Sequence, residues 1–156
     1  MWQVITQVDL RPGPIATVAA LLSAVLAGAL LGLEREARSK PAGLKTHAMV
    51  ALGAASFTLV GLAVIAGIGD LETVQVDPTR LISAVVAGIG FLGAGVILQG
   101  KGDIKHLTTA ATIWVAAAVG VACGVGHYLI AGTTVAAAML VLIVVRTLEH
   151  KLLDRD

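Results

Sequence analysis

The residues best suited to chemistry lie in one short charged segment, residues 34–47. It holds six charged side chains and is bordered by two runs without any, residues 12–33 and 46–69. Each run is long enough to cross a hydrocarbon core, which takes roughly 20 apolar helical residues. Charged groups at membrane depth are costly, so a retained one usually marks a function or a specific pairing. The segment is therefore expected to lie at a membrane surface and to hold the candidate site.

Glu34 ends the first apolar run and has two interpretations. As an ordinary flank it would be solvated; alternatively it turns into the bundle and pairs with Arg35, Arg38 or Lys45, the nearest basic residues in sequence. An unpaired carboxylate there would be costly, which favours pairing.

Lys45-Thr46-His47 opens the second apolar run, where Thr46 is suited to cap a helix. Free N–H groups at that helix start would attract an anion. Thr108 and Thr109 offer the same option at a later run. The predicted polar cluster therefore consists of Glu34, Arg35, Arg38, Lys45, Thr46, His47, Thr108 and Thr109.

Nothing resembles a catalytic constellation, because there is no nucleophile elbow, Walker loop or serine with a plausible base. The four histidines are scattered, and none forms an i, i+4 pair with another ligand type, so no metal site or cofactor is expected.

Cys123 is expected to be a small buried packing residue. The acidic residues of the second connection are expected to be plain loop carboxylates, with weak Mg²⁺ or Ca²⁺ contact as the alternative; they are Asp70, Glu72 and Asp77.

Composition shows what must position these residues. The 156 residues are 57% hydrophobic and 13% charged, about half the charged share of a soluble domain, and the dispersed basic residues give no nucleic-acid surface. This predicts an all-α membrane protein, a single domain over 1–156 without a soluble C-terminal domain. Its first apolar run is too long for a signal peptide. The expected spans are 14–33, 46–68, 80–99, 107–124 and 127–146, with the Gly124-Val125-Gly126-His127 turn between the last two.

Orientation follows from the bias of Lys and Arg toward cytoplasmic loops. With the N-terminus outside, nine basic residues lie in cytoplasmic segments and two, Arg11 and Arg80, lie outside. The predicted topology is N-out, C-in.

Small residues predict close helix packing in lipid. Ladders at i+4 run through Ala20, Ala24, Gly28 and Gly32, and through Thr112, Ala116, Gly120 and Gly124. The literal G-x-G-x-x-G match at Gly88, Gly90 and Gly93, followed by Gly95, lies inside a span, so helix packing is the better interpretation than a dinucleotide site. Intrachain packing is favoured, and a homo-oligomer face stays open.

The hairpins 14–68 and 80–124 would be a parallel repeat if Gly32 to Thr46 corresponds to Gly93 to Thr109. In that case Thr46 and Thr109 face one shared pocket, attractive to an anion.

Four blocks together resemble the MgtC/SapB family of bacterial inner-membrane proteins over about residues 15–146. They are Gly32-Leu33-Glu34-Arg35, Ala42-Gly43-Leu44-Lys45-Thr46-His47, Gly88 to Ile97, and Leu107-Thr108-Thr109-Ala110-Ala111-Thr112-Ile113-Trp114. The resemblance implies a five-span, N-out domain. It also implies a role in growth at low magnesium, with virulence-related members that restrain the ATP synthase rather than carry Mg²⁺.

The sequence departs from the family at His106-Leu107-Thr108-Thr109, where members often read Gly-Leu-Asn-Thr, and at Gly100, where some carry an acidic residue. The expected function is a non-enzymatic modulator of adaptation to low magnesium or stress, in contact with membrane lipid and with a complex such as the ATP synthase. The rival is a small transporter or channel with a path between the two hairpins. A third option is a structural subunit of a larger membrane complex.

Overall fold

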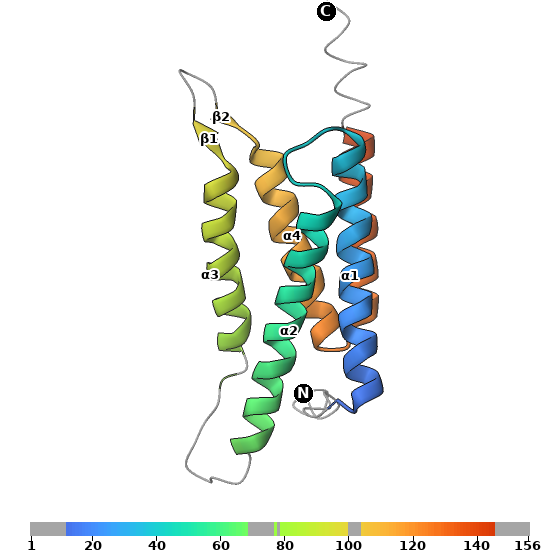
Figure 1. The fold of residues 1–156 in the computed structure, drawn as a ribbon, viewed down its shortest axis with the longest axis vertical. Helices are drawn as coiled ribbons and strands as arrows, with labels where there is room; N and C mark the ends of the chain where they lie inside the picture. Colours follow the sequence, from blue (N-terminus) through green and yellow to red (C-terminus); the bar gives the residue numbers. More distant parts are fainter. Residues whose placement is uncertain (1–11, 69–76, 78, 100–103, 146–156) are drawn as a thin grey trace, which may run out of the picture.

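The computed structural model describes residues 12–68, 77, 79–99 and 104–145. The described chain is helical apart from one small hairpin, and successive helices run in alternating directions (Figure 1). The elements are α1 (Pro14–Ala37), α2 (Leu44–Ile68), α3 (Thr79–Val96), β1 (Leu98–Gln99), β2 (Ile104–Lys105), α4 (Leu107–Gly124), α5 (Tyr128–Leu140) and the π-helix η2 (Val141–Val145).

Helix α1 starts with a proline in its first turn, where no hydrogen-bonded N–H is needed. It continues past the apolar run to Ala37, so the first charged residues are helical. It ends with the amide of Lys40 bonded to the Arg35 carbonyl and the amide of Ser39 bonded to the Glu36 carbonyl. This is a Schellman end, with Ser39 in the left-handed conformation at φ 54°.

Helix α4 is the centre of the bundle, because it packs against α1, α2, α3 and α5. Both small-residue ladders face inward: every member of the α1 and α4 ladders is buried. A Cβ on Gly28 would lie 2.5 Å from the His47 carbonyl oxygen, and one on Gly120 would overlap the Ala51 carbonyl. Helix backbones therefore touch at these glycines. Cys123 is buried in the same core, as predicted.

Helix α3 stands at the side of this core and has no buried residue among those described. Gly93 would contact the Ala110 methyl at 3.8 Å through an added Cβ. Gly88, Gly90 and Gly95 have nothing within 4 Å of such an atom. These three therefore lack, among the described residues, the close packing partner that the sequence pattern led us to expect.

Asp77 begins α3, because its carboxylate accepts hydrogen bonds from the Thr79 amide at 2.9 Å and the Thr79 hydroxyl at 2.7 Å. These bonds hold the pKa of Asp77 below its usual value. The carboxylate is thus a helix cap rather than a plain loop group. Asp70 and Glu72 lie outside the described residues.

The third predicted span, 80–99, is too long at its end. Helix α3 stops at Val96, and Leu98 and Gln99 pair antiparallel with Lys105 and Ile104. A polar, glycine-containing stretch follows, so the chain satisfies its backbone groups by pairing across a short hairpin instead of extending the helix.

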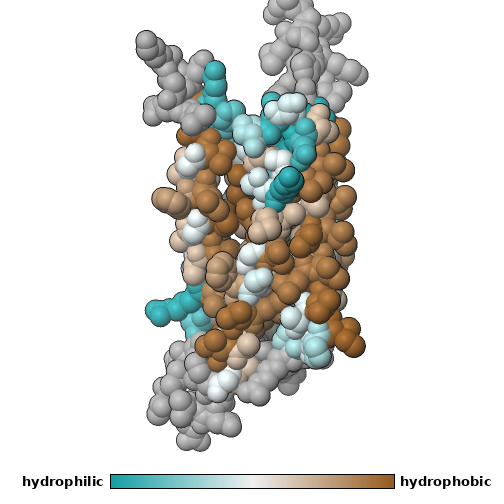
Figure 2. Space-filling model, viewed as in Figure 1, coloured by the Kyte–Doolittle hydropathy of each residue, from teal (hydrophilic) through white to brown (hydrophobic). Residues whose placement is uncertain are grey.

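The predicted turn after α4 is confirmed, with Gly126 at φ 80° and the amide of His127 bonded to the Ala122 carbonyl. The last predicted span divides into α5 and η2. By length and composition, α1, α2, α3 and α4 are long and apolar enough to cross a membrane, and Tyr128–Val144 forms a shorter apolar helix. Figure 2 shows an apolar band around the middle and hydrophilic side chains at the end that carries the α1–α2 connection and the hairpin.

Candidate functional site

Glu34 lies at the end of α1, where its side chain is only 6% exposed. Its carboxylate forms an ion pair with Arg38, one helical turn later, and lies 3.8 Å from the guanidinium of Arg35. The predicted pairing of Glu34 with a basic neighbour is confirmed. One carboxylate thus faces two guanidinium groups, which leaves these three side chains with a formal charge of +1.

Arg35 connects α1 to the central helix. Its guanidinium donates a hydrogen bond to the Thr109 hydroxyl at 3.1 Å, and both residues are buried. Thr109 lies in the first turn of α4. Burying a guanidinium is costly unless it has hydrogen-bond or ion-pair partners of this kind. The bond therefore fixes the end of α1 against the start of α4.

His47 connects α2 to the same helix and is fully buried. Its Nδ1 lies 2.9 Å from the Gly43 carbonyl oxygen and its Nε2 lies 3.0 Å from the Thr112 hydroxyl. A carbonyl oxygen only accepts, so Nδ1 must carry a proton. The Thr112 hydroxyl also lies 2.9 Å from the Thr109 carbonyl oxygen. Its single proton can serve Nε2 or that carbonyl, but not both at once.

The start of α2 is already occupied by a carboxylate of this chain. Glu36 accepts a hydrogen bond from the Leu44 amide at 2.8 Å. Its side chain also lies against Gly43, so that a Cβ there would be 2.7 Å from the carboxylate oxygen. The expectation that Thr46 caps this helix was therefore wrong. Glu36 is the cap, at the positive end of the helix dipole, and it takes one of the N–H groups that were expected to face an external anion.

The structure gathers only part of the predicted polar cluster. Glu34, Arg35, Arg38, His47 and Thr109 lie together, with Thr112 added; we call these six residues the buried polar cluster. Lys45, Thr46 and Thr108 are exposed outside it.

The shared pocket expected from the repeat is not formed, because Thr46 is exposed and Thr109 is 1% exposed. The two hairpins do run in the same directions (Figure 1), so the repeat itself stays a prediction.

The sequence did not predict two residues that take part in these contacts. Thr112 was assigned only to the packing ladder, although it lies three residues after Thr109 and thus on the same helix face. Glu36 was assigned no role. A carboxylate eight residues before a helix start has no sequence signature, because only the tight 38–43 connection brings it there.

Within the described ranges, no three His, Cys, Asp or Glu residues gather closely enough to hold a metal ion. The buried polar cluster consists instead of one carboxylate, two guanidinium groups, an imidazole and two hydroxyls. Such a set holds helices in fixed register and can exchange a hydroxyl proton between two acceptors.

Comparison with known proteins places these features in a family. The sequence profile of the MgtC family matches residues 21–151. A protein of Escherichia coli (strain K12) named putative magnesium transporter YhiD is 40% identical over 136 residues, which are 87% of this chain and 63% of the relative. Protein MgtC of Salmonella typhimurium (strain LT2) is 45% identical over 108 residues, which are 69% of this chain and 43% of the relative.

An uncharacterized protein of Haemophilus influenzae is 40% identical over 138 residues, 87% of this chain and 57% of its own length. This chain thus spans only 43% to 63% of the length of these relatives. No solved structure matches it. The family match, the agreement with these relatives and the four long apolar helices together show that the chain belongs to the MgtC family of multi-pass inner-membrane proteins.

Proposed function

We propose that this protein is a non-enzymatic modulator of adaptation to low magnesium or stress, and that the buried polar cluster is its working part. The observation that carries the proposal is the ion-paired Glu34, buried where a charged side chain is costly. Its magnesium connection rests on family membership and on the name of the Escherichia coli relative, putative magnesium transporter.

We further propose five crossings with the N-terminus outside, so that the buried polar cluster lies at the cytoplasmic side. The Lys and Arg distribution supports this orientation. A cytoplasmic position would let the cluster shape a surface that a larger membrane complex, such as the ATP synthase, can contact. Control of that complex is part of the proposal.

The test is growth at limiting Mg²⁺ in a host whose growth depends on this protein. Glu34→Ala leaves Arg35 and Arg38 without their shared carboxylate, and we expect it to abolish growth even after correction for the amount of folded protein in the membrane. Lys40→Ala is the matched control, because Lys40 is an exposed residue of the same connection. Wild-type growth of the Glu34→Ala strain would contradict the proposal.

A transporter is the second candidate, favoured by the name of the Escherichia coli relative. Its expected path, between the two hairpins, corresponds to a groove between α2 and α3 that is lined by apolar residues. Such a lining has no oxygen ligands to replace the waters of Mg²⁺. Mg²⁺ entry into vesicles containing the purified protein, if lost in Glu34→Ala, would select the transporter. Recovery of a membrane complex with the wild-type protein but not with Glu34→Ala would select the modulator.

A further inference from the structure

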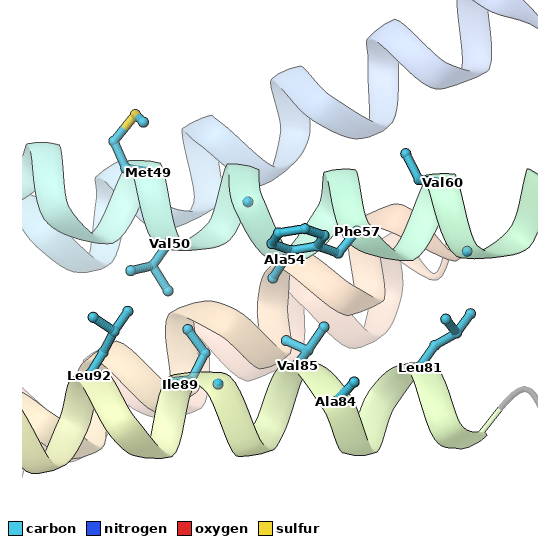
Figure 3. A pocket seen from close by; sticks show the side chains of 13 residues that line it. Met49, Val50, Ala54, Phe57, Val60, Leu81, Ala84, Val85, Ile89 and Leu92 are labelled. Carbon is cyan, nitrogen blue, oxygen red and sulfur yellow. The ribbon is translucent and has the colours of Figure 1, made fainter.

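A long groove separates α2 from α3. Thirteen residues line it, and none has a polar side chain. Figure 3 shows Leu81, Val85, Ile89 and Leu92 of α3 pointing toward α2, and Val50 and Ala54 of α2 pointing toward α3. The apolar faces of α2 and α3 therefore lie opposite each other, and the side chains of this protein do not fill the space between them. In the space-filling view the surface is hollowed along the same line (Figure 2).

The groove lies within the membrane, since both helices are candidate spans. Protein interiors and their boundaries are close-packed, so a space of this size must be filled. Water is a poor occupant, because it needs two to four polar partners and the lining supplies none. The filling material must therefore be hydrocarbon.

The length of the groove suits an acyl chain. From Met49 to Gly61 the groove follows α2 for 12 residues, or ~18 Å, slightly more than one leaflet of a hydrocarbon core about 30 Å thick. Its volume is about 780 Å³.

The charges at the two ends of the groove differ. On α2, Lys45 lies one turn before Met49, and Thr46 one turn before Val50, so both continue the groove face by helical spacing. Both are exposed, and Lys105 adds an exposed cation at the same end of the bundle, so that two lysines stand against the one Glu36 carboxylate at the start of α2. At the opposite end, Arg80 starts α3 beside the Asp77 carboxylate, which offsets its charge. A phosphate is therefore best placed at the Lys45 end.

We propose that the groove holds an acyl chain of an anionic phospholipid whose phosphate lies against Lys45 and Thr46. The lipid comes from the leaflet at the end of the bundle that holds the buried polar cluster. It completes the packing of α3, which accounts for a helix without buried residues and for Gly53 and Gly88, whose missing side chains leave open space on both walls.

The test uses the full chain in vesicles of equal parts phosphatidylglycerol and phosphatidylcholine, with a photoreactive group placed in the acyl chain of one lipid at a time. We expect labelled phosphatidylglycerol to mark the groove residues of α2 and α3 several-fold more than the exposed outer face of α5 at Leu129 and Leu140. Lys45→Gln should reduce the preference for phosphatidylglycerol about five-fold. Lys40→Gln, an exposed lysine of the preceding connection, should leave it unchanged.

A pair of α3 variants separates groove occupancy from general lipid contact. Gly88→Leu fills the groove and Gly90→Leu does not, although both positions have open space for a side chain. We expect groove labelling to fall several-fold only in Gly88→Leu. Equal labelling of groove and outer face, equal labelling by the two lipids, or an equal effect of both leucines would each overturn the proposal. So would cross-links between groove residues of two copies in place of lipid adducts.

Discussion

Two adjacent threonines at the start of α4 lie in different environments, and only one of them belongs to the buried polar cluster. Thr109 accepts a hydrogen bond from Arg35 and is buried, whereas Thr108 is exposed. The two residues have the same chemistry and differ only in the direction they face from α4. Their substitution by valine, which has nearly the same shape, removes a hydroxyl from two different environments.

We predict that Thr109→Val lowers the free energy of unfolding by about 1–3 kcal/mol, because the buried guanidinium of Arg35 loses a hydrogen-bond acceptor. Thr108→Val should change it by less than about 0.5 kcal/mol, as is usual at exposed positions. Denaturant unfolding of the purified protein in mixed micelles measures both values. Equal stabilities for the two variants would show that the Arg35–Thr109 bond carries no weight.

Sequence reasoning at this scale identified the pairing of Glu34, since the cost of a lone carboxylate beside an apolar run is visible in the sequence. It placed Thr46 in the site and left out Thr112. Which residues of a helix face the bundle depends on the rotation of that helix. For α2, the rotation depends on the contact between Gly28 of α1 and the backbone of His47. The sequence of α2 alone does not predict this contact.

At the scale of elements, glycines on α1 and α4 act as contact points between backbones. The Gly28 contact involves the carbonyl oxygen of His47, which cannot move away without displacing α2. Because His47 also bonds Thr112, any separation of α1 and α2 is transmitted to the buried polar cluster.

We predict that Gly28→Ala lowers the thermal unfolding midpoint, at a cost of about 1–3 kcal/mol from overpacking. Gly132→Ala on α5 is the matched control, since it has open space around it and should gain up to about 1 kcal/mol of helix stability. The midpoints can be compared by tryptophan fluorescence in the same detergent. If Gly28→Ala melts no lower than Gly132→Ala, the helices are not held by this backbone contact.

The helix boundaries were largely predictable, because charged residues interrupt the apolar runs. The structure places α1, α2 and α4 within four residues of the predicted limits, whereas α5 stops at Leu140 and η2 continues the last predicted span to Val145. The hairpin of β1 and β2 was missed, because two-residue strands carry too short a pattern to separate from a helix end. The open position of α3 was also missed, since its glycines resemble those that do pack.

At the scale of the whole molecule, the orientation in the membrane is the largest open prediction. We expect cysteine at Ser39 to be protected from an impermeant thiol reagent added to intact cells, and cysteine at Thr73 to react, because basic residues accumulate on the Ser39 side. The native Cys123 is 1% exposed and should give little background. Labelling of Ser39→Cys, with protection of Thr73→Cys, would reverse the proposed topology.

The central place of α4 has a consequence for biogenesis. Ribosomes deliver the chain from its N-terminus, so α1, α2 and α3 enter the membrane before α4 is made. Until then neither Arg35 nor His47 has its hydroxyl partner on α4, although Arg35 keeps the Glu34 carboxylate beside it. We therefore expect the α1–α2 hairpin to gain its full set of polar contacts, and the protein its stability in the bilayer, only when α4 has been inserted.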